Sequence, residues 1–215
     1  MLIAKMKHKQ GGFTIVELMF TIVVLGVLLA IGAPNFRDFL RNARLSAAAN
    51  DMIGALNLAR SETVKRRLPM SVCSSNGGTS CDDGKFNNGW VVFVDVDGDG
   101  TVDSGIDEVI EKRGAVPSSV TVVSVTEPDP DKPGSWAASS VSEFTYAPSG
   151  FRIVAGGGVP GDVAITFCDD RLNKVISGGA GTKISAGRVV DVSSLGRAHV
   201  LRDEAEITER AGCTK

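Results

Sequence analysis

Aspartates stand at every second position in the segment Asp95-Val96-Asp97-Gly98-Asp99-Gly100, and another follows at Asp103. Carboxylates at this spacing, with a glycine that allows a sharp turn, supply the oxygen ligands in the Ca²⁺ loops of EF-hands. The glutamate that closes such a loop is missing, because Ile106 occupies its place. Two interpretations stay open: a hairpin connection built from turn-forming residues, or a weak Ca²⁺ site at Asp95, Asp97, Asp99 and Asp103. We expect no other cofactor.

A single carboxylate, Glu17, lies inside an apolar run from Phe13 to Ala33. About 20 such residues span a bilayer as a helix, and lysines at positions 5, 7 and 9 hold the N-terminus in the cytoplasm. A secretory signal is cut after its apolar run, whereas here the small pair Gly11-Gly12 precedes the run. Cleavage there would remove a leader, residues 1–12, and keep the helix, residues 13–33.

The position of Glu17 also has a cost, because a carboxylate in hydrocarbon is unfavourable by several kcal/mol. Glu17 could lie shallow enough to reach headgroup water. Alternatively, cleavage before Phe13 creates an α-amine one helical turn from Glu17, and the amine of one subunit could pair with Glu17 of its neighbour.

The helical pattern continues beyond Pro34, and Pro69 cannot extend it. We therefore expect one helix from about Thr14 to Arg66, in which residues 34–67 form an amphipathic continuation. The apolar residues expected on its inner face are Phe36, Leu40, Ala43, Ala47, Ile53, Leu56 and Ala59.

The four cysteines allow three patterns of disulfide pairing. Cys73 and Cys81 flank a flexible polar loop, so we expect them to pair, which leaves Cys168 for Cys213. The competing interpretation is a zinc site, but zinc ligands stand closer in sequence and usually include histidine. All four lie on the expected exported side, where disulfides persist.

The N-terminal stretch Gly11-Gly12-Phe13-Thr14-Ile15-Val16-Glu17-Leu18 resembles the class III signal of type IV pilins and pseudopilins. The resemblance implies cleavage between Gly12 and Phe13 by a prepilin peptidase and N-methylation of Phe13. It also implies that Glu17 drives subunit docking, and Pro34 matches a helix-kinking proline of pilins.

The remainder, residues 68–215, is rich in glycine and β-branched residues and predicts an exported, disulfide-bonded β domain. The fold class is therefore α+β, a long N-terminal helix packed on an antiparallel β-sheet or β-sandwich, and the layout resembles the GspH/FimT branch of pilin-like proteins. The expected strands are residues 70–73, 89–95, 108–112, 120–126, 143–147, 151–155, 163–168, 174–176, 188–192 and 197–201.

Some members of the FimT branch carry a Gly-Arg-x-Arg motif that binds DNA. This chain keeps Gly196 and Arg197, but His199 replaces the second arginine and Arg202 follows three residues later. A mostly neutral histidine attracts phosphate weakly, and acidic residues come directly after Arg202. Arg197, His199 and Arg202 therefore form either a DNA contact or an ordinary charged surface strand.

Composition limits the functions further. The net charge is −2, and loss of the three leader lysines makes the remaining side chains −5, which disfavours general nucleic-acid binding. No nucleophile motif or metal triad is found, so we expect no enzyme. We expect a minor pilin that is held in the bacterial inner membrane by one helix, with its C-terminal domain in the periplasm, before it enters a filament with other pilins. The alternatives are a pseudopilin of type II secretion and a pilus-associated DNA-binding subunit.

Overall fold

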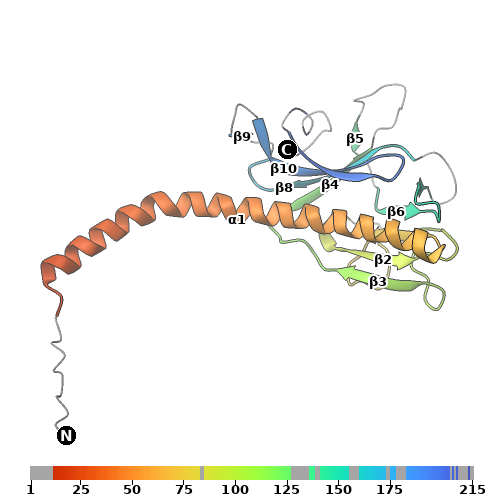
Figure 1. Ribbon diagram of the computed structural model, residues 1–215, viewed down its shortest axis with the longest axis horizontal. Coiled ribbons are helices and arrows are strands. Elements are labelled where there is room, and N and C mark those ends of the chain that lie inside the picture. The colour runs from red at the N-terminus through yellow and green to blue at the C-terminus, as the bar shows by residue number, and fades with distance from the viewer. Residues whose placement is uncertain are drawn as a thin grey trace, which may run out of the picture. The chain divides into compact units, whose positions relative to one another are not determined.

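A computed structural model describes residues 12–82, 85–126, 136–138, 141–154, 160–172, 175–177, 183–203, 205, 207 and 213 (Figure 1). The chain forms two compact units, Met1–Leu40 and Arg41–Lys215. Helix α1, Ile15–Arg66, contributes to both of them. The last part of the helix thus belongs to the β domain, whereas the sequence suggested a boundary at residue 68.

Thr14 precedes the first helical residue, Ile15, and its Oγ1 accepts a hydrogen bond of 3.2 Å from the backbone N–H of Glu17. This is the usual way in which a threonine caps a helix N-terminus. The helix continues without interruption through Pro34, where the side chain of Asn35 donates to the carbonyl of Ile31. A kink at Pro34 remains a prediction.

The second unit contains eleven described strands and one short 3₁₀ helix, η1, Phe86–Asn88. Every described strand pair is antiparallel. The strands are β1 Met70–Ser74, β2 Trp90–Val94, β3 Glu108–Arg113, β4 Thr121–Thr126, β5 Ala137–Ala138, β6 Glu143–Tyr146, β7 Arg152–Ile153, β8 Val163–Cys168, β9 Val175–Ser177, β10 Lys183–Val192 and β11 Ala198–Asp203.

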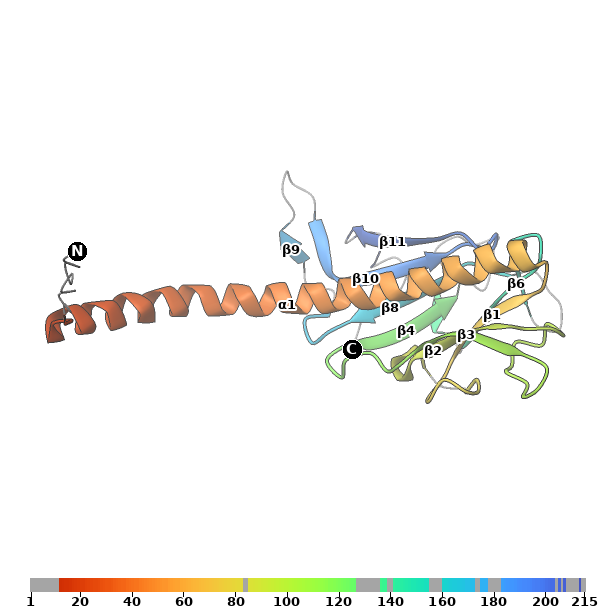
Figure 2. The ribbon, with the colours of Figure 1, turned by 60° about the horizontal axis from the view of Figure 1, so that its bottom comes forward.

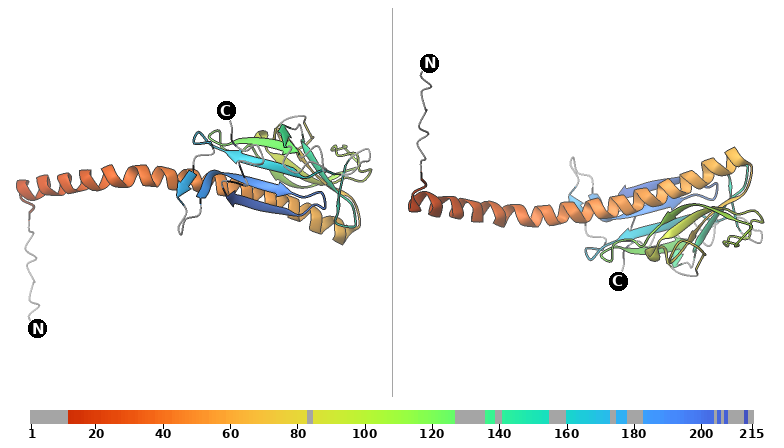
Figure 3. Two further views of the ribbon diagram at one scale, coloured as in Figure 1. Left: turned by 90° about the horizontal axis from the view of Figure 1, so that it is seen from above. Right: turned by 90° about the horizontal axis from the view of Figure 1, so that it is seen from below.

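The strands form two sheets beside the C-terminal part of α1 (Figure 2, Figure 3). The first has the order β3-β2-β1-β6-β7, and the second has the order β11-β10-β8-β4-β5, with β9 paired to β10. The α+β class expected from the sequence is confirmed, and β8 has the bounds that were expected. The short strand β5 was not expected, and β10 begins five residues earlier than expected, because Lys183–Ser185 pair with β9.

One continuous apolar core joins α1 to both sheets. The helix buries residues that recur every three or four positions, as a 3.6-residue repeat requires: Leu45, Ala48, Ala49, Met52, Ala55, Leu56 and Ala59. The face expected from the sequence was partly wrong. Leu56 and Ala59 are buried, but Ala43 and Ala47 are exposed and Ile53 is only half-buried, because the spacings chosen did not follow the helical repeat.

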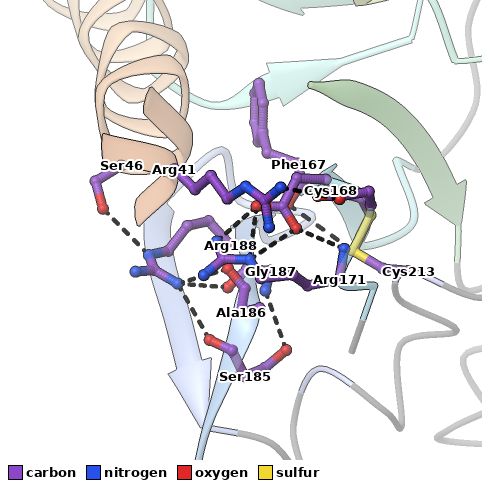
Figure 4. Close-up of polar contacts among 12 residues, drawn as sticks. Arg41, Ser46, Phe167, Cys168, Arg171, Ser185, Ala186, Gly187, Arg188 and Cys213 are labelled. Atoms are coloured by element: carbon purple, nitrogen blue, oxygen red, sulfur yellow. Dashed lines mark hydrogen bonds and ion pairs between the residues drawn. A yellow bond between two sulfur atoms is a disulfide. The ribbon is translucent and has the colours of Figure 1, made fainter. Parts of the chain in front are cut away.

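A buried arginine ties β10 to the helix (Figure 4). Arg188 is 1% exposed, and its Nη1 donates to the carbonyls of Ser185, Ala186 and Gly187 at 2.8–3.2 Å. Its Nε donates to Ser46 Oγ on α1 at 3.3 Å. The register between β10 and β11 shifts between Ile184 and Val189, so the guanidinium satisfies carbonyls in a stretch where the ladder is irregular.

Candidate functional site

The N-terminal part of α1 exposes its apolar side chains. Every described residue from Phe13 to Ala33 is exposed within this chain, and Phe13 is 81% exposed. The helix is long and apolar enough to cross a membrane by length and composition. An exposed apolar surface of this extent requires lipid or protein to cover it.

Glu17 lies in the first turn of this helix, three residues after the capping Thr14. A carboxylate in that position is favoured by the partial positive charge of the helix N-terminus. Thr14-Ile15-Val16-Glu17 also has the spacing of a capping box, a role that the sequence interpretation did not consider. Glu17 is exposed, so its carboxylate is available to a second molecule.

The aspartate loop connects β2 to β3. Three of its aspartates, Asp95, Asp97 and Asp99, bring one carboxylate oxygen each within 4.8 Å of one another, whereas Asp103 is not part of this group. Asp95 is fully buried and accepts backbone N–H groups from Gly98, Asp99 and Gly100 at 2.8–3.1 Å. It also accepts the hydroxyl of Ser71 at 2.6 Å. Asp95 therefore organises the loop by itself, with or without a cation.

Electrostatics in the loop favour added positive charge. Burial raises the pKa of Asp95, although its hydrogen bonds oppose this shift. The pKa of Asp103 is raised by desolvation and by the charges of Asp99, Asp97 and Asp107. Asp107 accepts hydrogen bonds from the backbone N–H groups of Val96 and Asp103. These bonds give Asp107 a structural role in the loop that does not require it to bind a metal ion.

A further carboxylate, Glu143, reaches the loop from β6, and the sequence interpretation did not include it. A Cβ built on Gly100 would lie 2.5 Å from Glu143 Oε2, so the carboxylate lies directly against the loop backbone. Burial raises the pKa of Glu143, and Asp95 and Asp99 raise it further. The glutamate that is absent from position 106 thus has a counterpart 37 residues later in the chain. No local sequence spacing could have indicated it, because the two segments meet only in the sheet.

The expected DNA-contact residues are only partly brought together. Arg197 and His199 are both exposed, at the turn between β10 and β11 and in β11 itself. Asp191 lies opposite His199, with its Oδ2 3.6 Å from Nε2, so an anionic group adjoins the histidine. Arg202 stands three positions further on, and residues three apart in a strand point to opposite faces. The three side chains therefore do not form one basic surface.

Both expected disulfides are present, Cys73–Cys81 and Cys168–Cys213, with Cα–Cα distances of 5.6 and 5.5 Å. No cysteine is left for a zinc site. Cys213 is buried against β10, where a Cβ on Gly187 would lie 2.9 Å from its Sγ (Figure 4). The second disulfide therefore fastens the C-terminal part of the chain to the end of β8.

Two family models match the chain. The model described as "Type II transport protein GspH" matches residues 48–196, most of the β domain together with the end of α1. This chain belongs to the GspH family. The model described as "Prokaryotic N-terminal methylation motif" matches residues 7–33, which include Gly12, Phe13 and Glu17. The GspH-family chain thus carries both parts of a type IV pilin or pseudopilin.

Individual relatives agree with this family. Fimbrial protein EcpC of Eikenella corrodens is 26% identical over 151 residues, which are 70% of this chain and 95% of that protein. Prepilin peptidase-dependent protein D of Escherichia coli K12 is 35% identical over 80 residues, 37% of this chain and 47% of that protein. The crystal structure of the type IV minor pilin FimU of Pseudomonas aeruginosa PAO1 has a TM-score of 0.51 and 19% identity, covering 78% of this chain and 94% of FimU. This last similarity concerns the fold.

Proposed function

We propose that this GspH-family chain is a minor pilin of a type IV pilus system that helps to initiate the filament. The observation that carries the proposal is the continuous helix α1, whose exposed apolar part bears one carboxylate and whose remainder is built into the core of the β domain. Such a helix can anchor the chain in the inner membrane first and pack against other subunits afterwards. The fimbrial relatives support a pilus as the destination.

The N-terminal steps follow from the methylation motif. A prepilin peptidase cuts between Gly12 and Phe13, and methylation then modifies the new amine of Phe13. In the filament, the apolar helices supply most of the association, and Glu17 pairs with the amine of an adjacent subunit, which fixes the register. The peptidase, the methyltransferase and the other pilins are therefore the expected partners.

Replacing Glu17 tests the assembly step. Glu17→Ala should still be inserted, cleaved after Gly12 and methylated, as mass spectrometry of the mature N-terminus would show, but it should be missing from sheared filaments. Because Glu17 also stands in a capping box, Glu17→Gln serves as the matched control for helix capping. Normal incorporation of the alanine variant would refute the docking role.

The second candidate function is that of a pseudopilin in type II secretion, which membership of the GspH family of type II transport proteins favours. A clean deletion, scored in one strain for surface pili and twitching, for secreted enzymes and for DNA uptake, separates the possibilities. Loss of pili and twitching supports the minor pilin, and loss of secretion alone supports the pseudopilin. Loss of DNA uptake with intact pili would instead support the DNA-binding alternative through Arg197, His199 and Arg202.

We also propose weak Ca²⁺ binding at the aspartate loop. Asp95, Asp97 and Asp99 offer carboxylate oxygens within 4.8 Å of one another, and Glu143 adds a fourth carboxylate beside Gly100. Oxygen ligands of this kind suit a hard divalent cation. Thermal unfolding with and without Ca²⁺ tests this site.

A further inference from the structure

Arg152 carries a buried positive charge that no described carboxylate pairs. The residue is 9% exposed, and its Nη1 has no hydrogen-bond partner. The guanidinium lies over the ring of Phe144, 5.5 Å from the ring centroid. Desolvation lowers the pKa of Arg152, and Tyr146 and Asp162 oppose this only through longer-range attraction. Because a buried polar group is costly when it lacks a hydrogen bond, the unsatisfied Nη1 of Arg152 requires an explanation.

Arg188 shows how the same domain treats a buried guanidinium that serves its own fold. That side chain donates to the three carbonyls of residues 185–187 and to Ser46. Arg152 has no comparable set of acceptors within the described part of the chain. The difference indicates that the partner of Arg152 is not supplied by the fold around it.

Arg152 lines a pocket of about 250 Å³ at the edge of the first sheet. The edge strand β7 is short and pairs only with Thr145 and Tyr146 of β6. The pocket lies where this pairing stops, and its other lining residues include Val141, Glu143, Thr145, Ile153 and Val154. The pocket therefore lies at an exposed sheet edge, next to the guanidinium of Arg152, which no described carboxylate pairs.

Polar and apolar side chains both line this pocket, and apolar side chains on one side of it are exposed. Ile153 and Val154 are 36% and 40% exposed, and the adjoining Phe151 is 51% exposed. Glu143 is the other charged residue of the lining, but its carboxylate lies against Gly100 of the aspartate loop and forms no ion pair with Arg152. A largely desolvated arginine beside exposed apolar side chains is typical of an interface hot spot, and its planar guanidinium can bind a carboxylate through two parallel hydrogen bonds.

We propose that the Arg152 pocket accepts an aspartate or glutamate side chain of a neighbouring filament subunit, whose apolar residues cover Ile153 and Val154. This inference rests on the proposed function, because a filament is what supplies the neighbour. A protein carboxylate fits better than a nucleic acid. A protein side chain brings a single negative charge to the pocket, whereas a nucleic acid brings successive phosphates, which Glu143 and the aspartates that act on it would repel more strongly.

The first test replaces the charge and keeps the bulk, with the full mature chain in its own host. Since Arg152 has no carboxylate partner within the described part of the chain, Arg152→Met should leave the unfolding midpoint unchanged or raise it. The amount of this variant in sheared filaments should fall several-fold. The matched control is Arg66→Met, because Arg66 is paired inside the chain with Glu62 and Glu108; its filament content should stay near that of the wild type.

A second variant supplies the missing carboxylate from within. Val154 lines the same pocket and lies two residues from Arg152, so Val154→Asp should pair with the guanidinium, raise the unfolding midpoint and lower the filament content. Val154→Asn has the shape of the aspartate variant without its charge. It should change neither the unfolding midpoint nor the filament content. These two variants remain informative even if Arg152→Met folds poorly.

Several results would overturn the inference. Normal filament content of Arg152→Met would do so, and so would a fall of its unfolding midpoint by more than about 5 °C, which would indicate a structural role. Reduced DNA binding of the purified variant with normal filament content would assign the pocket to a polyanion instead. Absence of the wild-type chain from both pili and pseudopili would overturn the proposed function itself. Equal incorporation of the wild type and the variant would overturn only the role of the Arg152 pocket.

Discussion

Gly196 packs against the ring of Tyr146, so closely that a Cβ built on Gly196 would lie 2.7 Å from Tyr146 Cε1. Gly196 has a φ of +80° and its backbone N–H donates to the carbonyl of Ser193, which closes the turn between β10 and β11. Tyr146 is fully buried, and burial raises the pKa of its hydroxyl to about 12. The turn that presents Arg197 is therefore fixed by contact with the core of the first sheet.

We expect Gly196→Ala to destabilise the domain by about 2–4 kcal/mol, because it adds a left-handed backbone penalty to a steric overlap with a buried ring. Urea unfolding of the purified protein would measure the loss. Gly54→Ala is the matched control, since Gly54 lies in α1 with nothing within 4 Å of its built Cβ. That change should stabilise the helix by about 0.5–1 kcal/mol. Equal effects of the two substitutions would contradict the close packing.

Replacement of Arg188 should be costly although it removes a buried charge. Arg188→Met leaves the carbonyls of Ser185, Ala186 and Gly187 without this donor, so we expect a loss of about 2–4 kcal/mol. Burial lowers the pKa of Arg188 to about 10, so the side chain is still charged at neutral pH. Ser46→Ala removes only one long hydrogen bond and should cost about 1 kcal/mol or less. Similar losses for both variants in denaturant unfolding would show that the carbonyl contacts contribute little.

The two disulfides should differ in their contribution to stability. Cys73–Cys81 closes a separation of 8 residues and Cys168–Cys213 one of 45. The chain-entropy relation then gives about 2.5 kcal/mol for the first and about 4 kcal/mol for the second. Thermal unfolding of the two Cys→Ser double variants would compare them. A larger loss for the Cys73/Cys81 pair would mean that local structure in the aspartate-loop region, and not loop length, decides the outcome.

Much of this organisation could be predicted from local sequence. Some elements depend on neighbouring residues alone, so local patterns predict them. Examples are the apolar run with its single Glu17, the helix end before Pro69 and the strand Val163–Cys168. The disulfide Cys73–Cys81 spans a short polar loop, which made the pairing evident. The remaining pair then followed by elimination.

The features that were missed depend on contacts between distant segments. Glu143 reaches the aspartate loop only because β6 and β2 both pair with β1. The missing hydrogen-bond partner of Arg152 Nη1 is a consequence of three-dimensional packing that no local pattern indicates. The buried face of α1 was partly misassigned for a different, local reason: the expected residues did not follow the 3.6-residue repeat, which includes Ala48 and excludes Ala47.

Glu143 predicts a specific pH dependence. Its pKa in the folded state is raised above 4.5 by burial, Asp95 and Asp99, so the folded protein retains a proton that the unfolded chain releases. The stabilising contribution is therefore full below pH 4.5 and is lost as pH rises through the folded pKa. We expect Glu143→Gln to be more stable than the wild type at pH 7 without calcium and equally stable below the unfolded pKa.

The measurement is the difference in unfolding free energy between Glu143→Gln and the wild type at several pH values. Taking the difference cancels the contributions of other groups to the pH dependence. One of these is Glu62, whose pKa is lowered by its hydrogen bonds to Arg66 and Lys65, so its contribution has the opposite sign. If the difference does not change with pH, the carboxylate of Glu143 does not experience the charges of the loop.

Bound calcium should offset the negative charges that raise the pKa of Glu143. With a dissociation constant of about 1 mM, as in extracellular modules, 10 mM Ca²⁺ should add about 1.4 kcal/mol to the unfolding free energy. Asp99→Asn and Glu143→Gln should each reduce the gain, because each removes a charged oxygen ligand, whereas Asp170→Asn should not, since Asp170 pairs with Arg41 elsewhere in the domain. Thermal unfolding with and without Ca²⁺, and with Mg²⁺ at the same ionic strength, would measure these effects. An equal gain in Asp99→Asn and the wild type would place any bound calcium outside the loop, and no gain in the wild type would leave the loop as a hairpin connection held together by Asp95.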